Sequence, residues 1–269
     1  MELGLALTLT ELWVVGRSGD AGEVAVGAAA DTVKIWVRKT LRVMTRIVEV
    51  VLVRHGESEW NAEHRFQGQQ GTGLSAVGLA QAEAAAVSLQ RLFADSTLAV
   101  SSDLQRVRET YLPWARATGR PIQIDPQWRE IDVGAWGGLL VQQVRTRWPE
   151  QVQAMEQGDD VARGGGETFA DLRERVWRAM TTLVESVADD GHDHTGSAPV
   201  IVFTHGGPIR VAAASALGLP PMGHRWLTAP HNCSFTLFRH QLTAGVLTAS
   251  ELVSYSNDAV QATSLSLFG

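Results

Sequence analysis

Two histidines of this sequence follow apolar runs in the same manner. His55 stands in the segment "RHG" directly after the apolar run Val48–Val53. His205 stands in the segment "THGG" directly after the run Val200–Phe203. Short runs of consecutive apolar residues predict strands that are buried on both faces, and open α/β sheets bind ligands at the carboxyl ends of their parallel strands. We therefore expect both histidines in one crevice at one edge of a sheet.

Two arginines and a carboxylate are expected in the same crevice. Arg54 precedes the first histidine, and Arg106 lies one turn into the helix pattern that follows the apolar run Leu98–Ser102. Glu130 lies in the glycine-rich segment "WREIDVGAWGG". Guanidinium groups fork onto phosphate oxygens, and main-chain N–H groups beside Gly206 can add donors because glycine permits close approach. This set suits a phosphate monoester, which is a dianion near neutral pH because its second pKa is about 6.

The same residues could carry out phosphoryl transfer. Two neighbouring guanidinium charges should lower the pKa of His55, so that its neutral ring can attack phosphorus in line, while His205 hydrogen-bonds another phosphate oxygen. A carboxylate is needed to protonate the leaving alkoxide and then to accept a proton from water. Chemistry alone allows either Glu130 or Asp132 in that role. This mechanism requires no metal, and the sequence has no carboxylate cluster suited to holding one.

An ordered set of motifs resembles the histidine phosphatase superfamily, also called the phosphoglycerate mutase-like family. The motifs are "RHGESEWN", "RFQGQ", "LSAVGLAQA", "SSDLQRVRET", "REIDVGAWGG", "GGGET" and "FTHGGPIR". The resemblance extends from about Val48 to Asn257, and an ordered set is far more specific than a single Arg-His-Gly. It implies a three-layer α/β/α sandwich with a mostly parallel central sheet.

The resemblance also assigns roles to individual residues. It implies that His55 is the phosphorylated histidine and that Glu130, rather than Asp132, is the proton donor. The residues that it assigns to the phosphate pocket are Arg54, Arg106 and His205, with Asn61 at a position that also reaches the phosphate.

Simpler structural roles are the alternatives for these residues. His55 could be a polar loop residue, and His205 could be a core histidine satisfied by main-chain groups. Arg106 could form a solvated pair on a helix surface. Asn61 could cap a turn, and Gln67 could either line the substrate entrance or hold the loop. The ordered motifs favour the catalytic interpretation of the two histidines.

Two departures from the family pattern bear on the activity. After "RFQGQ" the family usually has an aspartate followed by Pro-Leu, whereas this chain has "QGTGL", with Gly71 and Gly73, which predicts a looser loop near the entrance. Cofactor-dependent mutases carry a longer basic insertion and a Glu-Arg-His-Tyr-Gly type segment around the acid, whereas this chain has "REIDVGAWGG" and a short acidic and polar connection. The second departure favours a phosphatase over a mutase.

Strand and helix patterns alternate from Met44 onward, which predicts a mostly parallel sheet covered by helices on both faces. Residues 44–269 are predicted to form the folded domain, and residues 1–43 a poorly ordered N-terminal extension. Further strands are expected at 121–125, 232–238 and 249–256, and helices at Ser75–Phe93, from near Asp103 to Gly119, and after the glycine run 164–166.

Composition argues against several classes of protein. The net charge of -6 over 269 residues gives no electrostatic reason to expect nucleic acid or an anionic membrane surface as a partner. The single cysteine, Cys233, excludes an intrachain disulfide and fits the reducing cytoplasm. No apolar run reaches the roughly 18–20 residues that a membrane-spanning helix needs.

These observations predict a cytoplasmic, metal-independent phosphomonoesterase that uses no cofactor and hydrolyses a small phosphorylated metabolite through a phosphohistidine. The first alternative is a cofactor-dependent phosphoglycerate mutase, and the second is a binding or regulatory protein without turnover. The frequent Ala, Val and Arg suggest a bacterial source with GC-rich DNA. The sequence leaves the choice between a monomer and a homodimer open.

Overall fold

The structure is a computed structural model that describes residues 23–28, 31–36, 45–96, 98–189 and 198–258. The chain divides into two compact units, 1–44 and 45–269. In the first unit, β1 (Glu23–Ala28) pairs with β2 (Asp31–Trp36) in antiparallel fashion. The other residues of the 1–43 extension lie outside the described residues, so its expected poor order stays a prediction.

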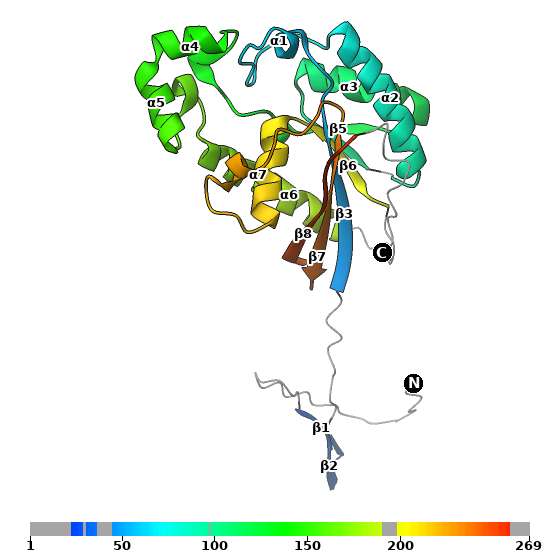
Figure 1. Cartoon of the computed structure of the whole chain (residues 1–269). Helices are drawn as coiled ribbons and strands as arrows, with labels where there is room; N and C mark the ends of the chain where they lie inside the picture. Colours follow the sequence, from blue (N-terminus) through cyan, green and yellow to red (C-terminus); the bar gives the residue numbers. More distant parts are fainter. Residues whose placement is uncertain (1–22, 29–30, 37–44, 97, 190–197, 259–269) are drawn as a thin grey trace. The chain divides into compact units, whose positions relative to one another are not determined.

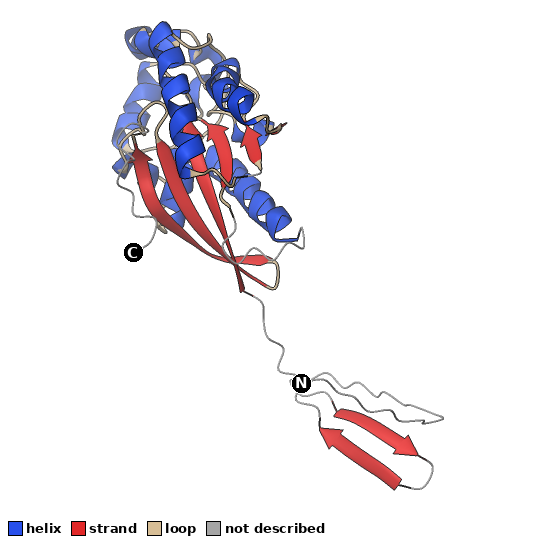
Figure 2. Cartoon of the chain, turned by 90° about the vertical axis from the view of Figure 1, so that its right-hand side faces the viewer, coloured by secondary structure: helices blue, strands red, loops and turns tan. Residues whose placement is uncertain are grey.

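The second unit is built on a six-stranded sheet with the order β5-β4-β6-β3-β7-β8 (Figures 1 and 2). The pairs β4–β5, β4–β6 and β3–β6 are parallel, whereas β7 is antiparallel to both β3 and β8. The predicted mostly parallel sheet is confirmed. The strands are β3 (Thr45–Arg54), β4 (Ala99–Ser101), β5 (Ile122–Ile124), β6 (Val200–Thr204), β7 (Phe235–Thr243) and β8 (Val246–Asn257).

Helices cover both faces of the sheet, which gives the predicted three layers. They are α1 (Glu59–Ala62), α2 (Ala76–Leu92), α3 (Gln105–Thr118), α4 (Val141–Arg147), α5 (Pro149–Gln157), α6 (Phe169–Asp189) and α7 (Gly206–Ala216). Every helix in the described part of the chain is too short or too polar to cross a membrane.

Side chains alternate across β3 and bind the layers together. Val51 and Val53 belong to a core with residues of α2 and α3, whereas Val50 and Leu52 belong to the opposite core with residues of α6 and α7. All four are fully buried. Successive side chains of a strand point to opposite faces, so an uninterrupted apolar run packs against both helical layers at once.

The predicted helix ends are also confirmed. Ser75 caps α2 by accepting a hydrogen bond from the main-chain N–H of Gly78 at 3.0 Å. Gly119 ends α3 in the left-handed conformation, with φ of 67°. Ser75 thus marks the start of α2, and Gly119 marks the end of α3, the helix that carries Arg106.

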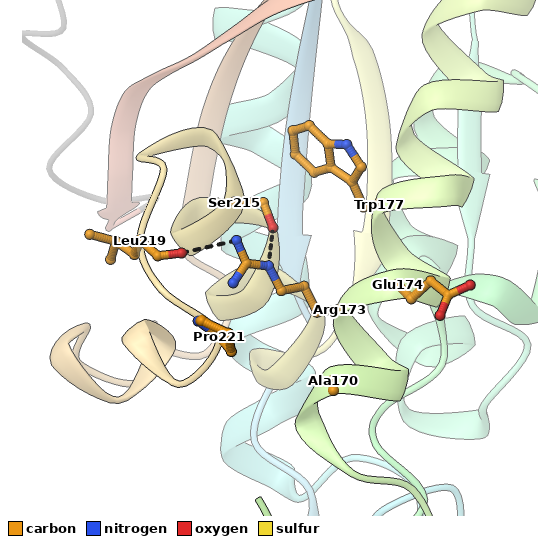
Figure 3. A pocket seen from close by; sticks show the side chains of 7 residues that line it. All are labelled: Ala170, Arg173, Glu174, Trp177, Ser215, Leu219 and Pro221. Atoms are coloured by element: carbon orange, nitrogen blue, oxygen red, sulfur yellow. Dashed lines mark hydrogen bonds between the residues drawn. The ribbon is translucent and has the colours of Figure 1, made fainter.

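On the other face, Arg173 of α6 joins that helix to the end of α7 (Figure 3). Its Nε donates to Oγ of Ser215 at 2.9 Å, and its Nη2 donates to the main-chain oxygen of Leu219 at 3.0 Å. The hollow beside this junction, which Trp177 also lines, has a volume of about 610 Å³. Neither predicted catalytic histidine lines it.

Candidate active site

The sheet order brings the two predicted catalytic histidines together. Strands β3 and β6 are parallel neighbours, and Arg54 is in register with Thr204. The next residue of each strand is therefore a histidine at the same carboxyl edge. The ring centroids of His55 and His205 lie 5.1 Å apart, edge to face, and both side chains are buried.

The hydrogen bonds of His55 determine which ring nitrogen is free to react. Nδ1 lies 2.7 Å from the main-chain oxygen of Gly56, so Nδ1 carries the proton and donates it. A lone pair is therefore left on Nε2, which accepts a hydrogen bond from Nε of Arg106 at 3.3 Å. Asn232 fixes the main chain at this point by donating to the oxygen of His55 at 2.9 Å.

Burial and charge keep the imidazole of His55 neutral. The pKa of His55 lies well below 6.5, first because burial penalises the charged form and then because Arg106 and Arg54 are close. The pKa of His205 is lowered in the same way, by burial and then by Arg106. Both rings are therefore uncharged at neutral pH, as the nucleophilic role requires.

Main-chain oxygens of the loop that follows α1 hold the guanidinium of Arg106. Its Nη1 donates to the main-chain oxygen of Gln70 at 2.8 Å, and its Nη2 donates to that of Gly68 at 2.7 Å. Burial lowers its pKa to about 10, so it remains a cation at neutral pH. This arrangement rules out the solvated surface pair that was the alternative for Arg106.

Two buried nitrogens at this edge have no hydrogen-bond partner among the described residues. Nε of Arg54 makes no hydrogen bond, although its Nη1 donates to the main-chain oxygen of Pro230. Nε2 of His205 lies 2.9 Å from Oγ of Ser102, and Nδ1 of the same ring has no partner. Buried N–H groups without partners are costly. Their convergence beside Arg106 indicates a place for an anion.

Glu130 lies against the start of α7. Its Oε2 accepts a hydrogen bond from the main-chain N–H of Gly207 at 3.1 Å, and its Oε1 accepts one from Ile131 at 2.8 Å. The competing carboxylate, Asp132, instead accepts a hydrogen bond from the main-chain N–H of Gly134 at 2.9 Å. Glu130 is therefore the carboxylate that reaches the first turn of α7, directly after His205.

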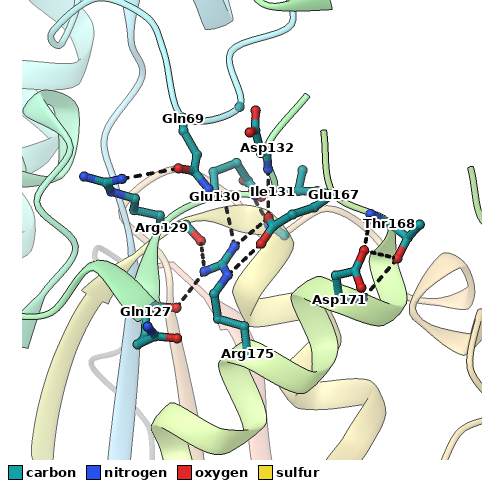
Figure 4. Close-up of polar contacts among 12 residues, drawn as sticks. Gln69, Gln127, Arg129, Glu130, Ile131, Asp132, Glu167, Thr168, Asp171 and Arg175 are labelled. Atoms are coloured by element: carbon teal, nitrogen blue, oxygen red, sulfur yellow. Dashed lines mark hydrogen bonds and ion pairs between the residues drawn. The ribbon is translucent and has the colours of Figure 1, made fainter. Parts of the chain in front are cut away.

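An ion pair from α6 fixes the segment that carries Glu130 (Figure 4). Arg175 binds both carboxylate oxygens of Glu167, at 2.8 Å and 2.7 Å. It also donates to the main-chain oxygens of Glu130 at 3.2 Å and of Arg129 at 3.0 Å. Gln69 reaches the same Glu130 oxygen at 3.3 Å. The acid is thus placed by two separate parts of the chain.

The remaining predicted residues are close to this set, but their side chains make structural contacts. Asn61 and Ser58 form a capping box at the start of α1, which is the simpler of the two predicted roles for Asn61. Oγ of Ser58 also donates to Oε1 of Gln67 at 2.8 Å. Gly206 is the first residue of α7 and lies against the guanidinium of Arg54. Roles for these residues in binding phosphate stay predictions.

Sequence reasoning missed two residues that support the site. Ser102 orients His205, and Gly207 leaves the space that the Glu130 carboxylate fills, because a Cβ at Gly207 would lie 2.0 Å from Oε1 of Glu130. A serine at a strand end and the second glycine of "THGG" were visible signals. Their partners come from distant segments, so the contacts themselves were not.

The comparison with protein families agrees with this geometry. The model of the histidine phosphatase superfamily (branch 1) matches residues 50–251. This chain belongs to that superfamily. It is accordingly a phosphatase, and its described fold is that of a histidine phosphatase.

Its relatives include enzymes of more than one activity. A glucosyl-3-phosphoglycerate phosphatase of Mycolicibacterium vanbaalenii is 37% identical over 175 residues, which are 65% of this chain and 76% of the relative. A probable phosphoglycerate mutase of Yersinia enterocolitica is 34% identical over 200 residues, which are 72% of this chain and 86% of the relative. The structure of a mycobacterial glucosyl-3-phosphoglycerate phosphatase, 30% identical, matches with a TM-score of 0.70 over 79% of this chain and all of its own.

Proposed function

We propose that this histidine phosphatase hydrolyses a small phosphate monoester in two steps through a phosphohistidine on Nε2 of His55. In the first step Nε2 attacks phosphorus, the ester P–O bond breaks, and the protonated Glu130 gives its proton to the leaving oxygen. In the second step Glu130 takes a proton from water, the water oxygen attacks phosphorus, and the N–P bond breaks. Phosphate is released and His55 is regenerated.

One observation carries this proposal. Nε2 of His55 holds a lone pair beside a guanidinium, while Nδ1 is fixed as the donor to Gly56. The neighbouring unpartnered donors, Nε of Arg54 and Nδ1 of His205, would bind the equatorial oxygens and stabilise the charge that develops on them. A protein that only binds phosphate has no need of a neutral, oriented nucleophile.

The leaving group is proposed to come from a small phosphorylated metabolite. The relatives named as acting on glucosyl-3-phosphoglycerate support such a substrate, as does an Arabidopsis relative named metal-independent phosphoserine phosphatase, 38% identical over 174 residues. The enzyme would act in the cytoplasm, and the single cysteine, the buried and unpaired Cys233, fits that reducing compartment. Mutase activity is the second candidate, because one group of relatives is named for it.

The proposal is tested by phosphate release from a panel of monoesters in the presence of a chelator. Wild-type protein should release phosphate without metal, and His55→Ala should lose turnover while keeping the circular dichroism spectrum of the wild type. Rapid acid-free quenching should trap a phosphoenzyme that is stable in base and labile in acid. Conversion of 3- to 2-phosphoglycerate without net phosphate release would instead establish a mutase. Full activity in His55→Ala would overturn the mechanism.

A further inference from the structure

A second group of side chains with unpartnered nitrogens lies next to Glu130, outside the phosphate pocket. Arg163 comes from the glycine-rich turn before α6, Arg210 from α7, and His224 from the 3₁₀ turn Gly223–Trp226. The guanidinium carbon of Arg163 lies 4.2 Å from the ring centroid of Phe169, and the ring of His224 stacks on the same phenylalanine at 3.8 Å. Nη2 of Arg210 donates to the main-chain oxygen of His224 at 2.8 Å.

Each of these three side chains keeps a buried nitrogen that has no partner in the described part of the chain. These atoms are Nη1 of Arg163, Nε of Arg210 and Nδ1 of His224. Among the residues that the structure describes, neither guanidinium has a carboxylate oxygen within 4.0 Å. Buried cationic donors are normally paired. Two guanidinium groups close enough to repel each other, each with an unpaired buried N–H, therefore indicate a site that an anion completes.

The group is placed on the side of the reaction where the leaving group departs. Arg210 follows Gly207 by three residues on α7, so the two share a helix face, and the N–H of Gly207 binds Glu130. The turn that carries Arg163 packs against the segment after Glu130, where a Cβ on Gly134 would lie 2.3 Å from the oxygen of Gly164. Because Glu130 protonates the leaving oxygen in the proposed mechanism, donors beside it face the leaving group.

The neighbouring charges favour an anion. The carboxylate of Asp160 is already committed to the main-chain N–H groups of Phe169 and Ala170, each at 2.8 Å. The charges facing Arg163 are Asp160, Glu130, Arg225 and Arg210. Three arginines against two carboxylates leave one positive charge, and two while Glu130 carries the proton that the first step requires. Burial and the arginines lower the pKa of His224 to about 4, so its ring is neutral at pH 7 and has one N–H. The ring hydrogen-bonds the main chain at Pro221, which leaves a lone pair on Nδ1.

We propose that Arg163 and Arg210 form a subsite that binds a carboxylate on the leaving group of the substrate. This inference rests on the proposed phosphatase function, and it narrows the substrate class to phosphate esters of hydroxy acids. A guanidinium fork matches the two oxygens of a carboxylate. The carboxylate would pair the buried donors, and its binding would place the ester oxygen beside Glu130.

The test compares phosphoserine with phosphoethanolamine, which differ only by the carboxylate. Dissociation constants are measured by calorimetry in the His55→Ala background, which holds the esters without turning them over, and kcat/KM is measured in the active background. With the subsite unaltered, we expect a lower dissociation constant and a higher kcat/KM for phosphoserine than for phosphoethanolamine. Arg163→Gln and Arg210→Gln should each reduce that preference about 10- to 100-fold, as loss of a hydrogen bond to a charged group does.

Arg178→Gln is the matched control, because Arg178 is an exposed arginine of α6 that pairs with Glu174. It should leave the preference unchanged. If Arg163 or Arg210 had only a structural role, its replacement would weaken the binding of both esters equally. The ratio of the two dissociation constants would then stay unchanged. If the protein with an unaltered subsite bound the two esters equally and still hydrolysed p-nitrophenyl phosphate, the proposed subsite would be wrong. The proposed phosphatase function would not be affected by that result. Preferred binding of phosphoserine without hydrolysis of any ester would overturn the proposed function instead.

Discussion

Arg175 of α6 donates a hydrogen bond to the main-chain oxygen of Glu130 at 3.2 Å while both oxygens of Glu167 hold its guanidinium. The ion pair is largely buried, with 15% and 22% of the two side chains exposed. Arg175 touches no reacting atom, so it acts as a positioning residue. The placement of the acid thus depends on a helix that contributes none of the catalytic side chains.

Replacing Arg175 by Gln should therefore impair proton transfer to the leaving group. We expect kcat for an alkyl phosphate to fall roughly tenfold or more, within the 10²–10⁴-fold that general acid catalysis contributes. Hydrolysis of p-nitrophenyl phosphate should fall much less, because p-nitrophenolate leaves without needing a proton. The comparison of kcat for the two esters is the measurement. Equal losses on both esters would argue against a role through Glu130, and Arg178→Gln again serves as the control.

Gly207→Ala should separate activity from stability. The added Cβ would meet the far end of the Glu130 side chain at 2.0 Å, so the carboxylate must move away. Alanine inside a helix is favoured over glycine by up to about 1 kcal/mol, which offsets the local disturbance. We expect activity on an alkyl phosphate to fall about 100-fold or more while thermal unfolding stays within a few degrees of the wild type. Retained activity would show that Glu130 is not needed in this position.

Arg106→Gln should raise the pKa of His55 partway toward its ordinary value, because Arg106 is, after burial, the largest of the causes that lower it. Titration of the histidine ring protons by NMR measures this shift. The affinity for inorganic phosphate should also weaken about 10- to 100-fold, since a charge-assisted hydrogen bond is lost. Arg108→Gln, on the exposed side of the same helix, is the matched control. An unchanged titration of His55 would show that burial alone sets its pKa.

Folding stability should decline as the pH falls below about 6.5. The histidines His55, His205, His224 and His240 have pKa values lowered in the folded chain, so the unfolded chain binds more protons in this window. Stability is complete above pH 6.5 and is lost toward pH 4. For His240, whose pKa is lowered to about 4 by burial, the loss between pH 7.5 and 5.0 is about 2 kcal/mol.

Urea unfolding at pH 7.5 and 5.0 checks this prediction. His240 lies on β7, away from the predicted catalytic residues, and His240→Asn should remove its share of the pH dependence. The variant should therefore lose less stability than the wild type over the same interval. A free energy of unfolding that does not change between these two pH values would contradict the assignment of neutral buried histidines.

Much of the fold could be predicted because its signals are local. The run Val48–Val53 is apolar at every position except Glu49, and a strand buried on both faces needs such a sequence. Ser75 and Gly119 marked helix ends through the hydrogen bonding and the φ angle that their types favour. The choice of Glu130 over Asp132 required the family resemblance, because both carboxylates lie in one glycine-rich segment.

The sequence by itself determined which side chains stand at the ends of buried strands, because strand and helix patterns repeat within a few residues. It thereby determined the pair His55 and His205 and the chemistry that they suit. Only the tertiary structure decided that β3 and β6 are neighbours, that Ser102 orients His205, and that Gly207 receives the carboxylate of Glu130. Such contacts join distant segments through sheet order and packing, which no local pattern encodes.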